Sequence, residues 1–150
     1  ARLKAYLKRL PDFDDVEAED RAIEVALNHP SVHQALSFLV SWPAHDKAAS
    51  LILSRASEID GNHYYILAPA AEQLAGKHPL AASLLLRAMI DFALGAARYK
   101  RYKYAAKHLL ECESLASQIE EFGDFESHVE YVTRLKAEHG RKSGFWSQIQ

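Results

Sequence analysis

The stretch from Leu80 to Ala97 is almost entirely apolar, and only Ser83, Arg87, Asp91 and Gly95 interrupt it. These four residues recur at intervals of four, which on a helix of about 3.6 residues per turn forms one narrow polar stripe. A helix that is apolar on its other sides must be covered by protein or span a membrane. Because a bilayer would penalise Arg87 and Asp91 by several kcal/mol each, the stretch predicts the central helix of a packed domain and no membrane span.

Helical spacing of apolar residues recurs on both sides of this stretch, and no segment alternates as a strand would. Pro43 stands where a first helical residue is favoured, and Gly123 with Asp124 is typical of a helix stop followed by a cap. The spacing predicts helices over residues 3–10, 12–28, 32–42, 43–59, 62–75, 80–97, 99–119 and 125–139, followed by an apolar turn over 145–149. The predicted fold class is therefore all-α.

A short internal repeat indicates how these helices are organised. The sequence Ala-Ala-Ser-Leu-Ile-Leu at 48–53 returns as Ala-Ala-Ser-Leu-Leu-Leu at 81–86, an offset of 33 residues. Helix pairs that repeat at about this period are typical of α-solenoids, where small residues let neighbouring helices approach closely. We therefore expect antiparallel helix pairs stacked as a short α-solenoid.

Length and composition limit the class of protein further. The chain has 150 residues, a net charge of −2 and one cysteine, Cys112. This length predicts a single helical domain over residues 1–150, and one cysteine excludes an internal disulfide and a cysteine-rich zinc site. A reducing, cytoplasmic location is the expectation. Because the sequence opens at Ala1 without an initiator methionine, we expect it to be the C-terminal part of a longer protein.

The segment 98–107 is the first candidate site, because it combines basic and aromatic side chains without an acidic one. Tyr99 and Tyr102 share the spacing of the buried stripe, which leaves Tyr104 as the ring nearest to the cations. Such a segment can be a solvated helix face, steer an acidic partner or bind phosphates and bases. The candidate partner-binding residues are Arg98, Lys100, Arg101, Lys103, Tyr104 and Lys107.

The polar stripe Ser83, Arg87 and Asp91 is the second candidate site. Polar groups on an otherwise buried helix need partners or a wet groove. Arg87 and Asp91 are four residues apart and can form an ion pair at the rim of the bundle. The alternative is a groove that faces a ligand.

Signals for catalysis, metals and cofactors are weak. His29 and His33 straddle Pro30, and no HExxH pattern, glycine-rich phosphate loop or nucleophile motif occurs in the sequence. Cys112 lies between Glu111 and Glu113, whose charges disfavour a thiolate. We expect no enzymatic activity, no metal and no cofactor.

Several of these residues also carry a resemblance to known families. The helix pairs resemble tetratricopeptide repeats, and the second half is more similar to the C-terminal helical domain of uncharacterised bacterial proteins, some with a SWIM-type zinc finger elsewhere. The matching residues are His78 to Ala82, Tyr102 to Leu110, Phe125, Tyr131, Val132, Leu135, His139, Arg141, Lys142, Phe145 and Trp146. The resemblance implies a bacterial helical interaction domain, and this chain lacks the finger's Cys and His pattern.

The sequence therefore predicts a protein-protein interaction or scaffolding module that binds a protein or peptide partner, whose identity the sequence does not give. The alternative is a nucleic-acid-associated helical domain that uses the basic, tyrosine-rich segment 98–107.

Overall fold

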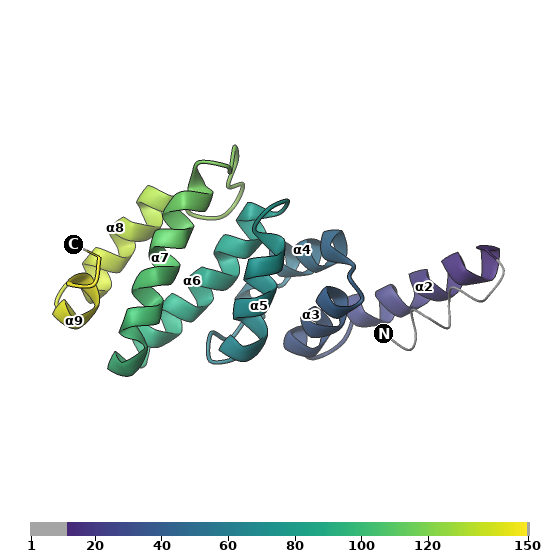
Figure 1. Ribbon diagram of the computed structural model, residues 1–150, viewed down its shortest axis with the longest axis horizontal. Coiled ribbons are helices and arrows are strands. Elements are labelled where there is room, and N and C mark those ends of the chain that lie inside the picture. The colour runs from purple at the N-terminus through teal and green to yellow at the C-terminus, as the bar shows by residue number, and fades with distance from the viewer. Residues whose placement is uncertain (1–11, 150) are drawn as a thin grey trace. The chain divides into compact units, whose positions relative to one another are not determined.

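The computed structural model describes residues 12–149, and every regular element in that range is a helix, which confirms the all-α prediction. The predicted helix over 3–10 lies outside the described residues. The described chain forms two compact units, one up to Ile59 and one from Asp60 onward. The helices carry the labels of Figure 1.

The first unit contains α2 (Asp12–Leu27), α3 (Val32–Ser41), α4 (His45–Ser54) and a 3-10 turn, η1 (Ala56–Glu58). The side-chain oxygen of Ser31 caps α3 by accepting a hydrogen bond from the Gln34 N–H at 3.2 Å. The buried residues of α3 and α4 form the core of this unit: Val32, Ala35, Leu36, Leu39, Ala48, Ala49, Leu51 and Ile52.

Arg55 holds the turn between α2 and α3 in place. Its guanidinium donates to the carbonyl oxygens of His29 at 2.7 Å and Pro30 at 3.2 Å, and it pairs with Glu58 at 2.7 Å. The sequence predicted that the fourth helix begins at Pro43. This is wrong, since α4 begins at His45. The Ala44 N–H instead bonds back to the Leu39 carbonyl, which closes the turn between the end of α3 and the start of α4.

The second unit contains α5 (Tyr64–Leu74), α6 (Pro79–Gly95), a 3-10 turn η2 (Tyr99–Arg101), α7 (Tyr102–Ala116), α8 (His128–His139) and α9 (Ser143–Trp146). Helix α6 lies between α5 and α7 and contacts both (Figure 1). This confirms its prediction as a central helix. Its buried residues are Ala81, Ala82, Ser83, Leu85, Leu86, Arg87, Met89, Ile90, Ala93 and Leu94.

The last two helices are held by a cap and an aromatic contact. Ser127, and not the predicted Asp124, caps α8 through a capping box with Glu130. Phe145 of α9 is fully buried, and its ring meets that of Tyr102 edge to face at 6.2 Å between centroids. The predicted final apolar turn therefore does fold back onto the helices. No helix within residues 12–149 is long and apolar enough to cross a membrane.

Candidate binding groove of the second unit

The turn between α6 and α7 brings the basic segment back toward the end of α6. Helix α6 ends at Gly95, and Ala97 then adopts a left-handed backbone with φ of 52°. The Arg98 N–H bonds to the Ala93 carbonyl at 2.8 Å, one turn inside α6. This reversal lays η2 against the last turn of α6 and carries Arg98 and Arg101 over its side chains.

Arg101 is held by two aromatic rings. Its Cζ lies 4.1 Å from the centroid of Tyr64 on α5 and 5.4 Å from that of Phe92 on α6. The Cζ of Arg98 lies 5.8 Å from the same Phe92 centroid. Contacts between a cation and a ring contribute about 0.5–1 kcal/mol each at exposed sites, so these rings favour this position of the Arg101 side chain.

A cavity of about 450 Å³ opens beside Arg101, and we call it the Arg101 groove. Its size lies within the range of about 300–1,000 Å³ found for small-molecule sites. Helices α5, α6 and α7 supply its walls, which are mainly apolar. The lining residues are Gly61, Tyr64, Ala68, Met89, Ala93, Arg101, Tyr104, Ala105 and His108.

The cations around this groove have no anionic partner in the described part of the chain. Arg98, Lys100, Arg101, Lys103 and Lys107 form no ion pair there. Lys100, Lys103 and Lys107 are exposed and do not line the cavity. Of the predicted partner-binding residues, Arg101 and Tyr104 therefore meet at the cavity, and the lysines provide a positive surface beside it.

The tyrosines of this segment differ from the prediction at one position. Tyr102 is buried as expected, but Tyr99 is 73% exposed. The three-residue turn η2 precedes α7, so Tyr99 does not share the helical phase of Tyr102. Tyr104 is 62% exposed, and two rings are therefore accessible among the basic residues.

The polar stripe of α6 faces the chain's own C-terminal helices. Ser83 and Arg87 are buried, and the Arg87 Cζ lies 4.7 Å from the ring centroid of Tyr131 and 5.6 Å from that of Phe122. Neither Arg87 Nε nor Ser83 Oγ has a hydrogen-bond partner among the described residues. Arg87 and Asp91 do not pair with each other there, because the rings hold Arg87 while Asp91 turns toward α8.

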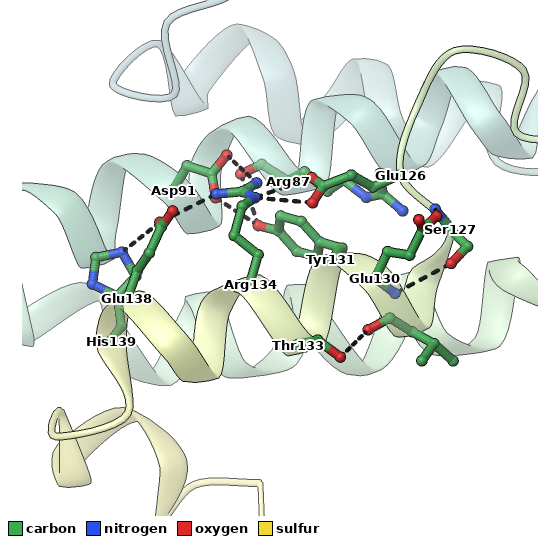
Figure 2. Close-up of polar contacts among 11 residues, drawn as sticks. Arg87, Asp91, Glu126, Ser127, Glu130, Tyr131, Thr133, Arg134, Glu138 and His139 are labelled. Atoms are coloured by element: carbon green, nitrogen blue, oxygen red, sulfur yellow. Dashed lines mark hydrogen bonds and ion pairs between the residues drawn. The ribbon is translucent and has the colours of Figure 1, made fainter.

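Asp91 joins a polar network on α8, drawn in Figure 2. The Tyr131 hydroxyl donates to Asp91 Oδ1 at 2.8 Å, and Arg134 approaches Asp91 Oδ2 at 3.9 Å. Arg134 also pairs with Glu126 at 3.0 Å and Glu138 at 3.3 Å. Burial raises the pKa of Asp91, while the hydrogen bond from Tyr131 and the charge of Arg134 oppose that rise. The stripe therefore attaches α8 to α6.

Burial affects the protonation of two side chains in the second unit, Cys112 and His108. Burial is the main cause that raises the pKa of Cys112 to about 12, so its thiol stays protonated at neutral pH. Burial also lowers the pKa of His108, which keeps this groove residue neutral. Between residues 12 and 149, no group of three or more His, Cys, Asp or Glu side chains is arranged to hold a metal ion.

Tyr64, Phe92 and Met89 belong to the site but were not predicted from the sequence. Their signal is weak, because each fits the apolar spacing of its own helix. Gly61 also lines the cavity and packs tightly against α6. A Cβ atom at this position would lie 1.9 Å from the Ala88 carbonyl oxygen. The turn before α5 can therefore approach α6 closely only with glycine at this position.

These features define an all-helical protein whose second unit carries a cationic, aromatic-lined groove. A family model described as a family of unknown function, DUF6880, matches residues 1–148, and the chain belongs to that family. No curated protein and no solved structure matches the chain significantly.

Proposed function

We propose that this chain is a non-catalytic protein-protein interaction or scaffolding module that binds an acidic, amphipathic segment of a partner in the Arg101 groove. The observation that carries the proposal is an apolar cavity of about 450 Å³ lined by Arg101, a cation that forms no ion pair within the described residues. Partner helices and peptides use this combination, in which apolar anchors fill a groove and charges at its rim set orientation.

The groove walls supply the apolar surface that a partner would contact. Ala68, Ala93 and Ala105 leave space between the helices, and Tyr64 and Met89 provide large apolar contacts. Tyr64 and Tyr65 are 51% and 65% exposed, so an aromatic surface continues outside the cavity. Burying such rings against an apolar side chain is a main source of binding free energy at interfaces.

The basic segment 98–107 supplies the positive charge that would attract an acidic partner. Five cations lie within residues 98–107, and no acidic side chain interrupts them. An acidic partner is attracted to this surface, and charge at the rim of an interface mainly raises the association rate. The occupant that fits both parts is an amphipathic segment with an apolar face flanked by Asp or Glu.

We further propose that the helix pairs are units of a short, tetratricopeptide-like solenoid and that the protein acts in a bacterial cytoplasm. The support for repetition is that three of the six residue pairs at the offset of 33 are buried in both segments. These pairs are Ala48 with Ala81, Ala49 with Ala82, and Ile52 with Leu85. The pairs Ser50 with Ser83, Leu51 with Leu84 and Leu53 with Leu86 differ in burial. Equivalent packing positions are what repeated helix pairs require.

The experiment compares two triple variants in affinity capture from a lysate of the source organism, with and without nuclease. The first variant reverses three positive charges beside the groove, with the substitutions Lys100→Glu, Lys103→Glu and Lys107→Glu. The control reverses three exposed lysines elsewhere, Lys47, Lys77 and Lys136, to Glu. We expect a nuclease-resistant protein partner that the first variant loses and the control retains.

The captured partner is then purified and its acidic segment is titrated against the same two variants. Binding that weakens about tenfold or more in the groove variant alone supports the proposal, since removing several rim charges lowers affinity through lost attraction. Equal capture and equal affinity for wild type and both variants would overturn it.

A second candidate function is binding of single-stranded nucleic acid, and the exposure of Tyr99 and Tyr104 favours it. Rings among cations are the elements that stack unpaired bases and neutralise phosphates. A fluorescent oligonucleotide measured by anisotropy tests this candidate. Binding to nucleic acid should fall steeply with salt and be lost in the triple variant of Lys100, Lys103 and Lys107. Tight binding with both properties would favour nucleic acid over a protein partner.

A further inference from the structure

The Arg101 side chain lies against two aromatic rings, and its hydrogen-bond donors have no acceptor within residues 12–149. The rings of Tyr64 and Phe92 lie 4.1 Å and 5.4 Å from its Cζ. No carboxylate or carbonyl in the described part of the chain accepts a hydrogen bond from its guanidinium. A guanidinium carries five N–H donors in a rigid fork, and this fork matches the two oxygens of a carboxylate or phosphate.

Arg98 adds a second positive charge against the same ring. Its Cζ and that of Arg101 lie 5.8 Å and 5.4 Å from the centroid of Phe92. Neither guanidinium pairs with a carboxylate among the described residues. Two such cations in contact with one side chain raise the local positive potential, which favours an anion as the ligand.

The cavity beside Arg101 defines the rest of the ligand. Its walls of Ala68, Met89, Ala93 and Ala105 offer no charged group to a polar ligand. Burial keeps His108, also in the wall, in its neutral form. The Nδ1 of His108 is buried without a hydrogen-bond partner among the described residues, so the wall offers one polar contact. The walls otherwise favour an apolar group, and an aromatic ring or a branched aliphatic side chain has a suitable size.

We propose that the Arg101 groove is a binding site for an amphipathic oxyanion, whose apolar group fills the cavity and whose carboxylate or phosphate is held by Arg101 with Arg98 beside it. This inference rests on the proposed function, because it names the anchor by which the partner is held. A protein partner supplies this chemistry through an apolar residue beside Asp or Glu, or through a phosphorylated side chain.

The single methionine of the chain provides a direct reporter of the cavity. Met89 lines it and is 5% exposed. The full chain labelled with 13C in the methionine methyl group is titrated and followed by NMR. Met89→Leu assigns the signal by removing it.

The probes separate the two parts of the proposed ligand. The amphipathic anions are 3-phenylpropionate and phenyl phosphate, the apolar control is 3-phenylpropanol, and the anionic controls are acetate and inorganic phosphate. We expect an amphipathic anion to shift the Met89 signal with a Kd of about 1 mM, which is ordinary for a ligand of this size. The alcohol should bind about tenfold more weakly, and the small anions should not move the signal. The stronger of the two amphipathic anions identifies the carboxylate or the phosphate as the oxyanion.

Variants test the assignment of the anion to Arg101. Arg101→Ala and Arg101→Lys should each weaken binding of the preferred anion about tenfold, because a lysine cannot make the two parallel hydrogen bonds of a guanidinium. Lys136→Ala removes an exposed charge on α8, outside the cavity and outside the basic segment, and should change Kd by less than about twofold. Equal binding of 3-phenylpropanol and 3-phenylpropionate to the unchanged protein would overturn the inference, as would wild-type affinity in Arg101→Ala.

The two proposals fail separately. If the lysine variants lose a protein partner and neither phenyl anion shifts Met89, the proposed function holds and the oxyanion site is wrong. If the anions bind through Arg101 and no partner depends on the basic segment, the oxyanion site holds and the proposed function is wrong.

Discussion

The hydroxyl of Tyr131 on α8 donates a 2.8 Å hydrogen bond to Oδ1 of Asp91 on α6, forty residues earlier in the chain. Tyr131 is fully buried, and its ring also faces the guanidinium of Arg87. One tyrosine thus meets two members of the polar stripe on the central helix (Figure 2). The charged residues that interrupt an apolar helix serve here to attach α8.

Tyr131→Phe should lower the free energy of unfolding by about 1–2 kcal/mol, because Asp91 loses its donor while the rest of the ring stays in place. The variant should also raise the pKa of Asp91 further, since the tyrosine hydrogen bond lowers it. Urea denaturation and NMR titration of the carboxyl carbon measure the two effects. Tyr102→Phe is the matched control, because Tyr102 is also buried and its hydroxyl has no hydrogen bond to another described residue. Equal losses in both variants would show that the bond to Asp91 contributes nothing.

Asp91→Asn should raise the free energy of unfolding relative to wild type, and this gain should be larger at neutral pH than at acidic pH. Burial raises the folded-state pKa of Asp91 above its unfolded value, so between the two values the folded state binds more protons. The free energy of unfolding therefore falls as pH rises through this window, and the penalty is absent below the unfolded pKa. The amide keeps the acceptor for Tyr131 and removes the titration. The effect should be modest, because the Asp91 side chain is 44% exposed.

Stability curves for wild type and Asp91→Asn, measured from pH 3 to 8, test this sign. The difference in unfolding free energy should be smallest at low pH and grow in favour of Asn as pH rises. A difference that grows in favour of aspartate would mean that Arg134 and Tyr131 outweigh the burial of the carboxylate.

Arg87→Met should leave the free energy of unfolding unchanged or raise it by about 1 kcal/mol. Arg87 is 6% exposed, and its Nε has no partner among the described residues, so its desolvation is poorly compensated. Methionine keeps most of the volume between the rings of Phe122 and Tyr131. Arg87→Ala, which opens a cavity, should cost about 2–4 kcal/mol. If Arg87→Met lowers the free energy of unfolding as much as Arg87→Ala does, the contacts of the guanidinium with the two rings contribute more than its desolvation costs.

The sequence was sufficient to predict features that depend on one helix alone. The composition of 80–97 identifies a central helix because only burial explains so many apolar residues, and the intervals of Ser83, Arg87 and Asp91 place them on one face. The periodicity does not identify what covers that face. Tyr131 and Phe122 come from segments more than thirty residues away, and their contacts with Arg87 depend on tertiary packing.

The candidate site was predictable in part for the same reason. The charge and tyrosine content of 98–107 indicates a binding surface, and Arg101 and Tyr104 do line a cavity. The cavity itself needs Tyr64 from α5 and Met89 from α6, and no pattern within 98–107 contains them. The spacing of Tyr99 and Tyr102 predicts a shared buried face only for a continuous helix, and the three-residue turn η2 shifts the phase of Tyr99.

Gly61→Ala should lower the free energy of unfolding by about 3 kcal/mol, at the upper end of the cost of overpacking. A Cβ atom there would lie 1.9 Å from the Ala88 carbonyl oxygen and 2.8 Å from Phe92 Cβ, and backbone cannot move aside easily. Gly76→Ala is the control, because a Cβ at that turn meets nothing within 4 Å. Thermal unfolding of both variants tests the difference, and similar melting temperatures would mean that the turn before α5 can move away from α6 at little cost.

Ala97→Gly should raise the free energy of unfolding by about 0.5–1 kcal/mol. Ala97 has a φ of 52°, and an alanine in this left-handed region costs about 1–2 kcal/mol relative to an ordinary backbone conformation. Glycine removes that strain, although it loses about 0.5–1 kcal/mol of backbone entropy on folding. Ala96→Gly is the control next to it, since Ala96 has a φ of −90° and glycine there brings the entropic cost without relief of strain. Chemical denaturation should therefore move the two midpoints in opposite directions. Parallel destabilisation would show that the reversal carrying Arg98 and Arg101 back over α6 is formed without strain at Ala97.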